Sequence, residues 1–112
     1  MNVPAAEVEV VAMSTAVAAG TFVESTVKYI RLTNLDDTNH ITLTFKDEDA
    51  TEVALLLDKG QSFIYNGDIS AGVVNTMHAG GSALTVSLND LVNITALADT
   101  AACDMEIFVA ST

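Results

Sequence analysis

The C-terminal segment decides the fold, and it contains three short runs of alternating residues: Leu84-Thr-Val-Ser-Leu88, Leu91-Val-Asn-Ile94-Thr-Ala96 and Asp104-Met-Glu-Ile107-Phe-Val109. Polar or small residues separate them, Asn89-Asp90 after the first run and Ala98–Ala102 after the second. Alternating runs of this length with polar turns between them are typical of antiparallel strands. A chain built from such strands leaves little room for a reaction centre, so the segment indicates a small all-β protein.

The middle of the chain continues the same rhythm. Its clearest alternation is Ile41-Thr-Leu-Thr-Phe45, which places the apolar residues on one face and the threonines on the other. Val53–Leu57 is apolar on both faces, which predicts a central or covered strand. Further strand candidates are Val27–Thr33, Gln61–Tyr65 and Ile69–Met77, with turns at Asn34–Asn39, Asp47–Ala50, Asp58–Gly60 and Asn66-Gly67.

These segments predict a single domain of about eight strands spaced about 8–12 residues apart, the pattern of a sandwich or small jelly roll. We therefore expect an all-β fold, an antiparallel β-sandwich or jelly-roll-like domain over residues 27–112 with an N-terminal extension. Period-2 placement predicts a core that contains Ile41, Leu43, Phe45, Val53, Leu55, Leu84, Val86, Ile107 and Val109.

Residues 1–26 have two interpretations. Glu7–Val11 alternates like a strand, whereas Pro4 cannot donate to a strand ladder. Val10–Val23 is apolar and weakly charged, and an exposed stretch of that kind needs a partner to cover it. The segment is therefore either an arm that contacts a neighbouring molecule or the first strand of the domain. As an arm, it could be deleted without unfolding the sandwich.

The charge balance narrows the range of partners. Fifteen Asp and Glu against four Lys and Arg give a net charge of −11. This excess argues against binding to nucleic acid, which needs clustered cations, and against an anionic membrane surface. It favours solubility or a basic partner surface. Two of the cations, Lys28 and Arg31, lie on one predicted strand, where they either pair with acids of a neighbouring copy or stay solvated.

The sequence contains no set of residues typical of a metal site. Asp47-Glu48-Asp49 is acidic, but a calcium loop that begins at Asp47 would place Glu52 where Gly is needed. We therefore interpret this segment, like Asp36-Asp37, as a solvated turn. Two isolated histidines, His40 and His78, lack the closely spaced further ligands that zinc requires. We expect no metal, cofactor-binding or catalytic residue.

Cysteine and targeting patterns add little. Cys103 is the only cysteine, which excludes an intramolecular disulfide and favours a buried inert thiol. No Lys or Arg precedes residue 28, and no hydrophobic run reaches about 18 residues. We expect synthesis in a cytoplasm, without a signal peptide or membrane span.

Three segments carry a resemblance. Tyr29–Asn34, Asp58–Phe63 and the C-terminal Ala98–Thr112 resemble small β-sandwich structural proteins of tailed bacteriophage virions. The resemblance implies a capsid decoration (cement) subunit on the capsid surface that stabilises capsomer junctions. It further implies a homotrimer bound to the major capsid protein. Contact residues of that class have no counterpart that we align here.

Two other functions remain open. One is a β-sandwich binding module for a receptor or carbohydrate, and the other is a tail-associated virion protein. Carbohydrate modules expose aromatic platforms, whereas the six aromatic residues here lie mostly at inward strand positions and Trp is absent. An enzyme is disfavoured, because the chain has no phosphate loop, Gly-x-Gly-x-x-Gly motif or Gly-x-Ser-x-Gly elbow.

Overall fold

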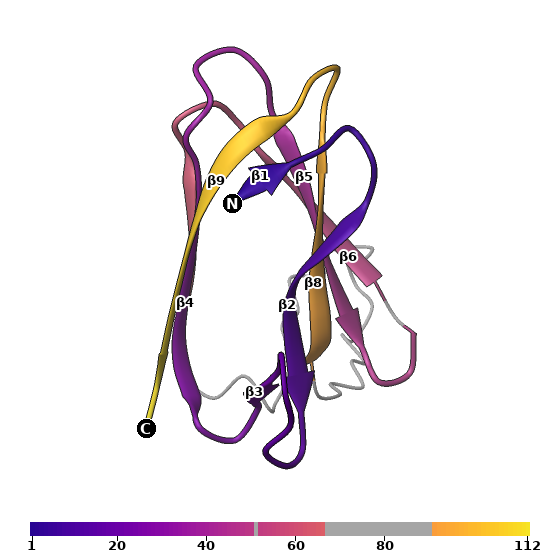
Figure 1. Cartoon of the computed structure of the whole chain (residues 1–112), viewed down its shortest axis with the longest axis vertical. Coiled ribbons are helices and arrows are strands. Elements are labelled where there is room, and N and C mark those ends of the chain that lie inside the picture. The colour runs from indigo at the N-terminus through magenta and orange to yellow at the C-terminus, as the bar shows by residue number, and fades with distance from the viewer. Residues whose placement is uncertain (51, 67–90) are drawn as a thin grey trace, which may run out of the picture.

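The fold is all-β. A computed structural model describes residues 1–50, 52–66 and 91–112, which form nine strands in two sheets (Figure 1). The predicted all-β sandwich is therefore confirmed. The strand candidates at 69–77 and 84–88, His78, the core candidates Leu84 and Val86, and the Asn66-Gly67 turn as a whole lie outside the described residues.

One sheet has four antiparallel strands, and their order is β1-β9-β4-β7. The strands are β1 (Asn2–Val3), β9 (Cys103–Ser111), β4 (Val27–Asn34) and β7 (Ser62–Asn66).

The other sheet has five strands in the order β3-β2-β8-β5-β6. The strands are β3 (Phe22–Val23), β2 (Val8–Ser14), β8 (Leu91–Ala98), β5 (Ile41–Asp47) and β6 (Glu52–Leu57). The short β2–β3 pair is parallel, and the other pairs are antiparallel. The predicted antiparallel arrangement thus holds for all but this pair.

The hydrophobic core is formed by residues of both sheets. The alternating strand β5 buries Ile41, Leu43 and Phe45, as its pattern predicts. The other predicted residues within the described chain are partly buried: Leu55, Ile107 and Val109 pack against the core, and Val53 is half-buried. The rest of the buried hydrophobic core comes from Val3, Val11, Met13, Val27, Ile30, Leu32, Leu57, Leu91, Ile94, Ala96, Ala98, Cys103 and Met105.

The N-terminal residues belong to the sandwich rather than to a separate arm. β1 pairs with β9, and β2 pairs with β8 in the five-stranded sheet. Val3, Val11 and Met13 are buried in the core because they face the same interior as the later strands. The first-strand interpretation is therefore the one that the structure supports, and the sandwich begins at Asn2 rather than at residue 27.

The prediction that Val53–Leu57 is central or covered is wrong within the described residues. This segment belongs to β6, which stands at the end of the five-stranded order. Leu55 and Leu57 face inward, but Leu56 on the opposite face is 58% exposed. An apolar residue on both faces of a strand therefore does not by itself require cover on both sides.

A bulge in β4 sets which of its residues face outward. The register against β9 shifts between Val27 and Tyr29. The shift lets both Val27 and Ile30 point inward, although strict alternation would place residues three apart on opposite faces. Tyr29 and Arg31 consequently lie on the outer face of the four-stranded sheet.

Candidate interaction surface

The outer face of the four-stranded sheet carries a row of large side chains. Arg31 on the middle strand β4 pairs in register with Phe108 of β9 on one side and Ile64 of β7 on the other. Phe108 is 48% exposed and Ile64 is 53% exposed. Three neighbouring strands thus present a continuous, partly apolar surface on the left-hand side of Figure 1.

Contacts within this row fix the side chains relative to one another. The Arg31 guanidinium carbon lies 5.3 Å from the ring centroid of Phe108, and Arg31 Nη2 donates to Glu106 Oε1 at 2.9 Å. Tyr29 meets Phe108 edge to face, with ring centroids 5.8 Å apart. We call Tyr29, Arg31, Ile64, Glu106 and Phe108 the aromatic face. Its side chains are organised before any partner arrives.

The aromatic face departs from the expected inward orientation of the aromatic residues. Phe45 is buried, and Phe63 and Tyr65 pack against the core, but Tyr29 and Phe108 face outward. The signal was present in the sequence, because Ile107 and Val109 facing inward on a strand require Phe108 to face outward. Arg and aromatic residues are enriched in protein interfaces.

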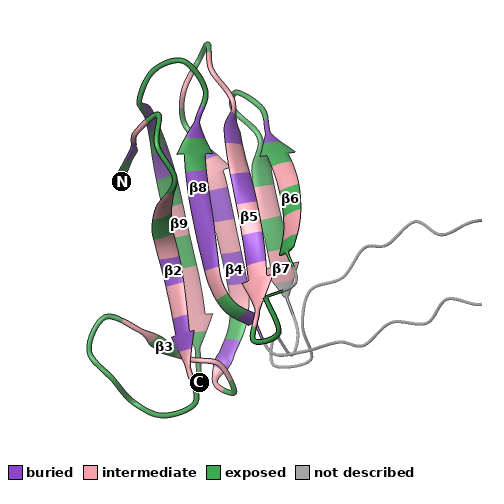
Figure 2. Cartoon of the chain, turned by 90° about the vertical axis from the view of Figure 1, so that its right-hand side faces the viewer, coloured by how far each residue is buried: buried purple, intermediate pink, exposed green. Residues whose placement is uncertain are grey.

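A second exposed feature is the loop between β2 and β3, residues 15–21, at the lower left of Figure 2. It contains no charged residue, and Val17 near its middle is 92% exposed. The Ser14 hydroxyl lies 2.8 Å from that of Thr21 and donates to the Ala16 carbonyl at 2.7 Å. This loop is the part of residues 1–26 that extends beyond the sheets.

The outer face of the five-stranded sheet is different in character. Lys46 lies between two carboxylates, 2.7 Å from Glu7 Oε1 and 3.5 Å from Glu52 Oε1. The hydrogen bond with Glu7 raises the pKa of Lys46 above its ordinary value, and that with Lys46 lowers the pKa of Glu7. Farther along the sheet, Leu56 and Leu97 are exposed on either side of Thr42.

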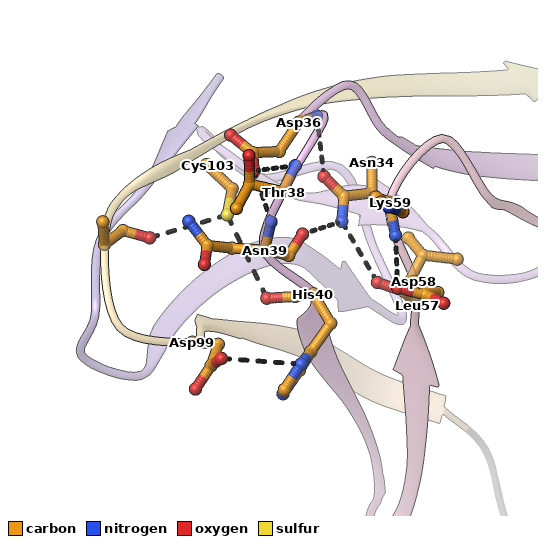
Figure 3. A network of polar contacts seen from close by, with 11 residues as sticks. Asn34, Asp36, Thr38, Asn39, His40, Leu57, Asp58, Lys59, Asp99 and Cys103 are labelled. Atoms are coloured by element: carbon orange, nitrogen blue, oxygen red, sulfur yellow. Dashed lines mark hydrogen bonds and ion pairs between the residues drawn. The ribbon is translucent and has the colours of Figure 1, made fainter.

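The loops at one end of the sandwich form a polar network around Asn34, which is fully buried (Figure 3). Asn34 Nδ2 donates to the carbonyls of Asn39 at 2.9 Å and Leu57 at 3.1 Å, and its Oδ1 accepts from the Asp36 amide at 2.9 Å. Every polar atom of this side chain is therefore used within the fold. The contacts are structural and leave no group for a ligand.

The Asp36 carboxylate closes the same loop. Asp36 Oδ2 accepts hydrogen bonds from the amides of Asn39 at 2.6 Å and Thr38 at 2.9 Å. These backbone hydrogen bonds hold the pKa of Asp36 below its ordinary value. Asp36 is thus a turn-forming residue rather than a metal ligand.

Cys103 lies beside this network and is fully buried, as the sequence predicts. Its Sγ lies 3.5 Å from the Ala101 carbonyl and 4.0 Å from the His40 carbonyl. Burial, together with the negative charges of Asp36, Asp99 and Asp104, raises the pKa of the thiol. The sulfur contacts the His40 backbone, whereas the imidazole Nδ1 lies 3.7 Å from Asp99. The arrangement is not that of an activated thiolate.

The other candidates from the sequence give no binding site. The Asp49 amide donates to Asp47 Oδ1 at 3.0 Å, and Ala50 follows with a φ of 64°, which describes a tight turn. Over residues 1–50, 52–66 and 91–112, no three His, Cys, Asp or Glu side chains gather as metal ligands would. A cavity of about 200 Å³ between β6 and β7 is smaller than most ligand pockets, which begin at about 300 Å³.

Comparison of the chain with protein-family models, with curated proteins and with solved structures finds no match. The described part of the chain contains no helix with the length and apolar character needed to cross a bilayer. The aromatic face is therefore the feature from which a function is best argued.

Proposed function

We propose that this protein is a structural subunit of a tailed bacteriophage virion, most simply a capsid decoration subunit that contacts other proteins through its aromatic face. The observation that carries the proposal is the exposed row formed by Phe108, Arg31 and Ile64. The virion setting comes from the resemblance of the sequence to phage structural proteins. A small β-sandwich agrees with that resemblance.

The chemistry of the aromatic face suits a protein partner. Phe108 and Ile64 offer apolar area to bury, and Arg31 adds a planar donor that stacks on the ring and pairs with Glu106. Aromatic and arginine side chains in this combination contribute most of the binding energy in many interfaces. Because the contacts are already formed in the free protein, little side-chain entropy is lost on binding.

A second candidate function is recognition of a carbohydrate or receptor. The observation in its favour is that Tyr29 and Phe108 lie together on one outer sheet face with the Glu106 carboxylate nearby. The opposing observation is that Arg31 covers one side of the Phe108 ring and Tyr29 meets it edge to face. Sugar stacking needs an open ring, so we rank this function second. Binding to a glycan array would favour it.

The proposal is tested on virus particles. Virions induced from the bacterium that carries the gene are purified, and their proteins are quantified by mass spectrometry. A decoration subunit should be a major head component. It should also bind again to heads that have been stripped of it, with the major capsid protein as the neighbour in cross-linking.

Variants identify the surface used. Phe108→Asp should bind stripped heads much less than wild type does, whereas Leu56→Asp on the other sheet should bind normally. Absence of the protein from purified virions would refute the proposed function. Normal binding of Phe108→Asp would refute the role of the aromatic face.

A further inference from the structure

We infer that a second copy of this chain covers the aromatic face, and that the two copies are related by a two-fold axis passing near Phe108. This inference rests on the proposed function only in that it assigns a partner to the same surface. The argument comes from the distribution of charge across that surface and from the register of β4 and β9.

The aromatic face carries its own complement. Arg31 and Phe108 are register partners on neighbouring strands, and Glu106 lies two residues before Phe108 on β9 with its side chain on the same face. A two-fold axis near Phe108 would bring the two Phe108 rings together. It would also bring Arg31 of each copy to Glu106 of the other copy. Such a contact is isologous, because the same pair of residues is used twice.

The charge of the whole chain makes this pairing selective. At a net charge of −11, two copies repel each other over most approaches. The aromatic face combines one cation, one anion and two exposed apolar side chains, Ile64 and Phe108. It is therefore a surface on which apolar burial and opposite charges act together against the repulsion.

The other exposed apolar features lack this complementarity. The row formed by Leu56, Thr42 and Leu97 carries no charged side chain, and the same is true of the loop at residues 15–21. Nothing in their charge specifies a second copy. The two-fold arrangement replaces the trimer that the sequence resemblance implies.

The test uses charge reversal with purified full-length protein in sedimentation velocity over a range of concentrations. Wild type should form a dimer. Arg31→Glu and Glu106→Arg should each weaken dimerisation by at least about tenfold, because each variant places like charges opposite one another. Both positions are partly exposed, so the fold should be retained, and circular dichroism verifies this.

Mixing the two variants separates contacts between copies from contacts within a copy. In a mixed pair, the glutamate introduced by Arg31→Glu in one copy faces the arginine introduced by Glu106→Arg in the other. The unchanged Glu106 of the first copy faces the unchanged Arg31 of the second, so both opposite-charge pairs return. The mixture should therefore form heterodimers to within about threefold of the wild-type affinity. The pair inside each copy stays broken, so this recovery depends on the contact between copies.

Matched controls change the same charge elsewhere. Lys59→Glu and Glu48→Arg lie in turns away from the aromatic face and should leave dimerisation within about twofold of wild type. A monomeric wild type, a dimer insensitive to both reversals, or a mixture that stays monomeric would each overturn the inference. Head binding by a monomer would leave the proposed function standing, and a dimer absent from virions would refute that function alone.

Discussion

Asn34 Nδ2 donates a hydrogen bond of 3.1 Å to the carbonyl of Leu57, and this bond joins the end of β4 in one sheet to the end of β6 in the other. The same amide group donates to the Asn39 carbonyl at 2.9 Å. One fully buried polar side chain thus connects the two layers of the sandwich at its loop end.

Replacing Asn34 with Ala should lower the free energy of unfolding by roughly 3 kcal/mol, because it leaves buried backbone groups without partners. Urea denaturation followed by circular dichroism measures the change. Asn2→Ala is the matched control, since the exposed Asn2 side chain donates to Asp104 at 3.2 Å and its loss should cost below about 0.5 kcal/mol. Equal effects of the two variants would contradict the structural role of Asn34.

Phe45→Ala should lower the free energy of unfolding by about 3–5 kcal/mol. Phe45 is 3% exposed and its ring centroid lies 5.1 Å from that of Phe63, so the substitution opens a cavity between the sheets. Leu56→Ala provides the comparison, because Leu56 is 58% exposed and its truncation should change stability by less than about 1 kcal/mol. A Phe45→Ala variant as stable as Leu56→Ala would show that the core is misassigned.

The sequence predicted those parts of the fold in which local alternation and burial coincide. Ile41-Thr-Leu-Thr-Phe45 is buried as expected, because each threonine marks the solvent side of its strand. The same reasoning failed for Val3 and Met13, since small residues and a nearby proline hide the strand pattern. Asn34 was assigned to a turn, and its burial was missed because Asn usually signals an exposed turn.

The candidate site was predictable in part. Alternation within β9 already places Phe108 opposite Ile107 and Val109. The contact between Arg31 and Glu106 joins residues 75 positions apart in the chain, and no local pattern reveals that β4 lies beside β9. Residue character therefore predicts which side chains face outward, whereas tertiary pairing decides which of them meet.

Asp36→Asn should lower stability at neutral pH, and the difference from wild type should disappear in acid. Backbone hydrogen bonds from Asn39 and Thr38 lower the pKa of Asp36 in the folded state. Its contribution is therefore fully present above the ordinary pKa of about 3.9 and is lost as the pH falls through the lowered value. Thermal melts from pH 7 to pH 2 measure this.

Asp37→Asn serves as the control for that pH series. The Asp37 carboxylate accepts a hydrogen bond from the Thr38 hydroxyl at 2.9 Å rather than from those two amides. Its variant should follow the wild-type pH profile. If Asp36→Asn also follows the wild-type profile down to pH 2, the backbone contacts of Asp36 do not contribute to stability.

The Cys103 thiol should react slowly with Ellman's reagent in the native protein at pH 8. It is fully buried, and burial beside three carboxylates raises its pKa, so little thiolate forms and the reagent cannot reach it. In denaturant the same assay should show one reactive thiol per chain at once, since the chain has a single cysteine. Fast reaction of the native protein would instead indicate an accessible, activated cysteine.

Deleting residues 1–14 should abolish cooperative unfolding, contrary to the behaviour expected of a dispensable arm. The deletion removes β1 and β2, takes the buried side chains of Val3, Val11 and Met13 out of the core, and uncovers the edge of β8 that pairs with β2. An uncovered strand edge of this kind promotes aggregation. Calorimetry and size-exclusion chromatography would therefore show loss of the melting transition and a shift to large species. Val17→Asp is the control: Val17 is 92% exposed in the loop after β2, so its variant should melt like wild type. A truncated protein that melts cooperatively near the wild-type temperature would show that the later strands form the sandwich without β2.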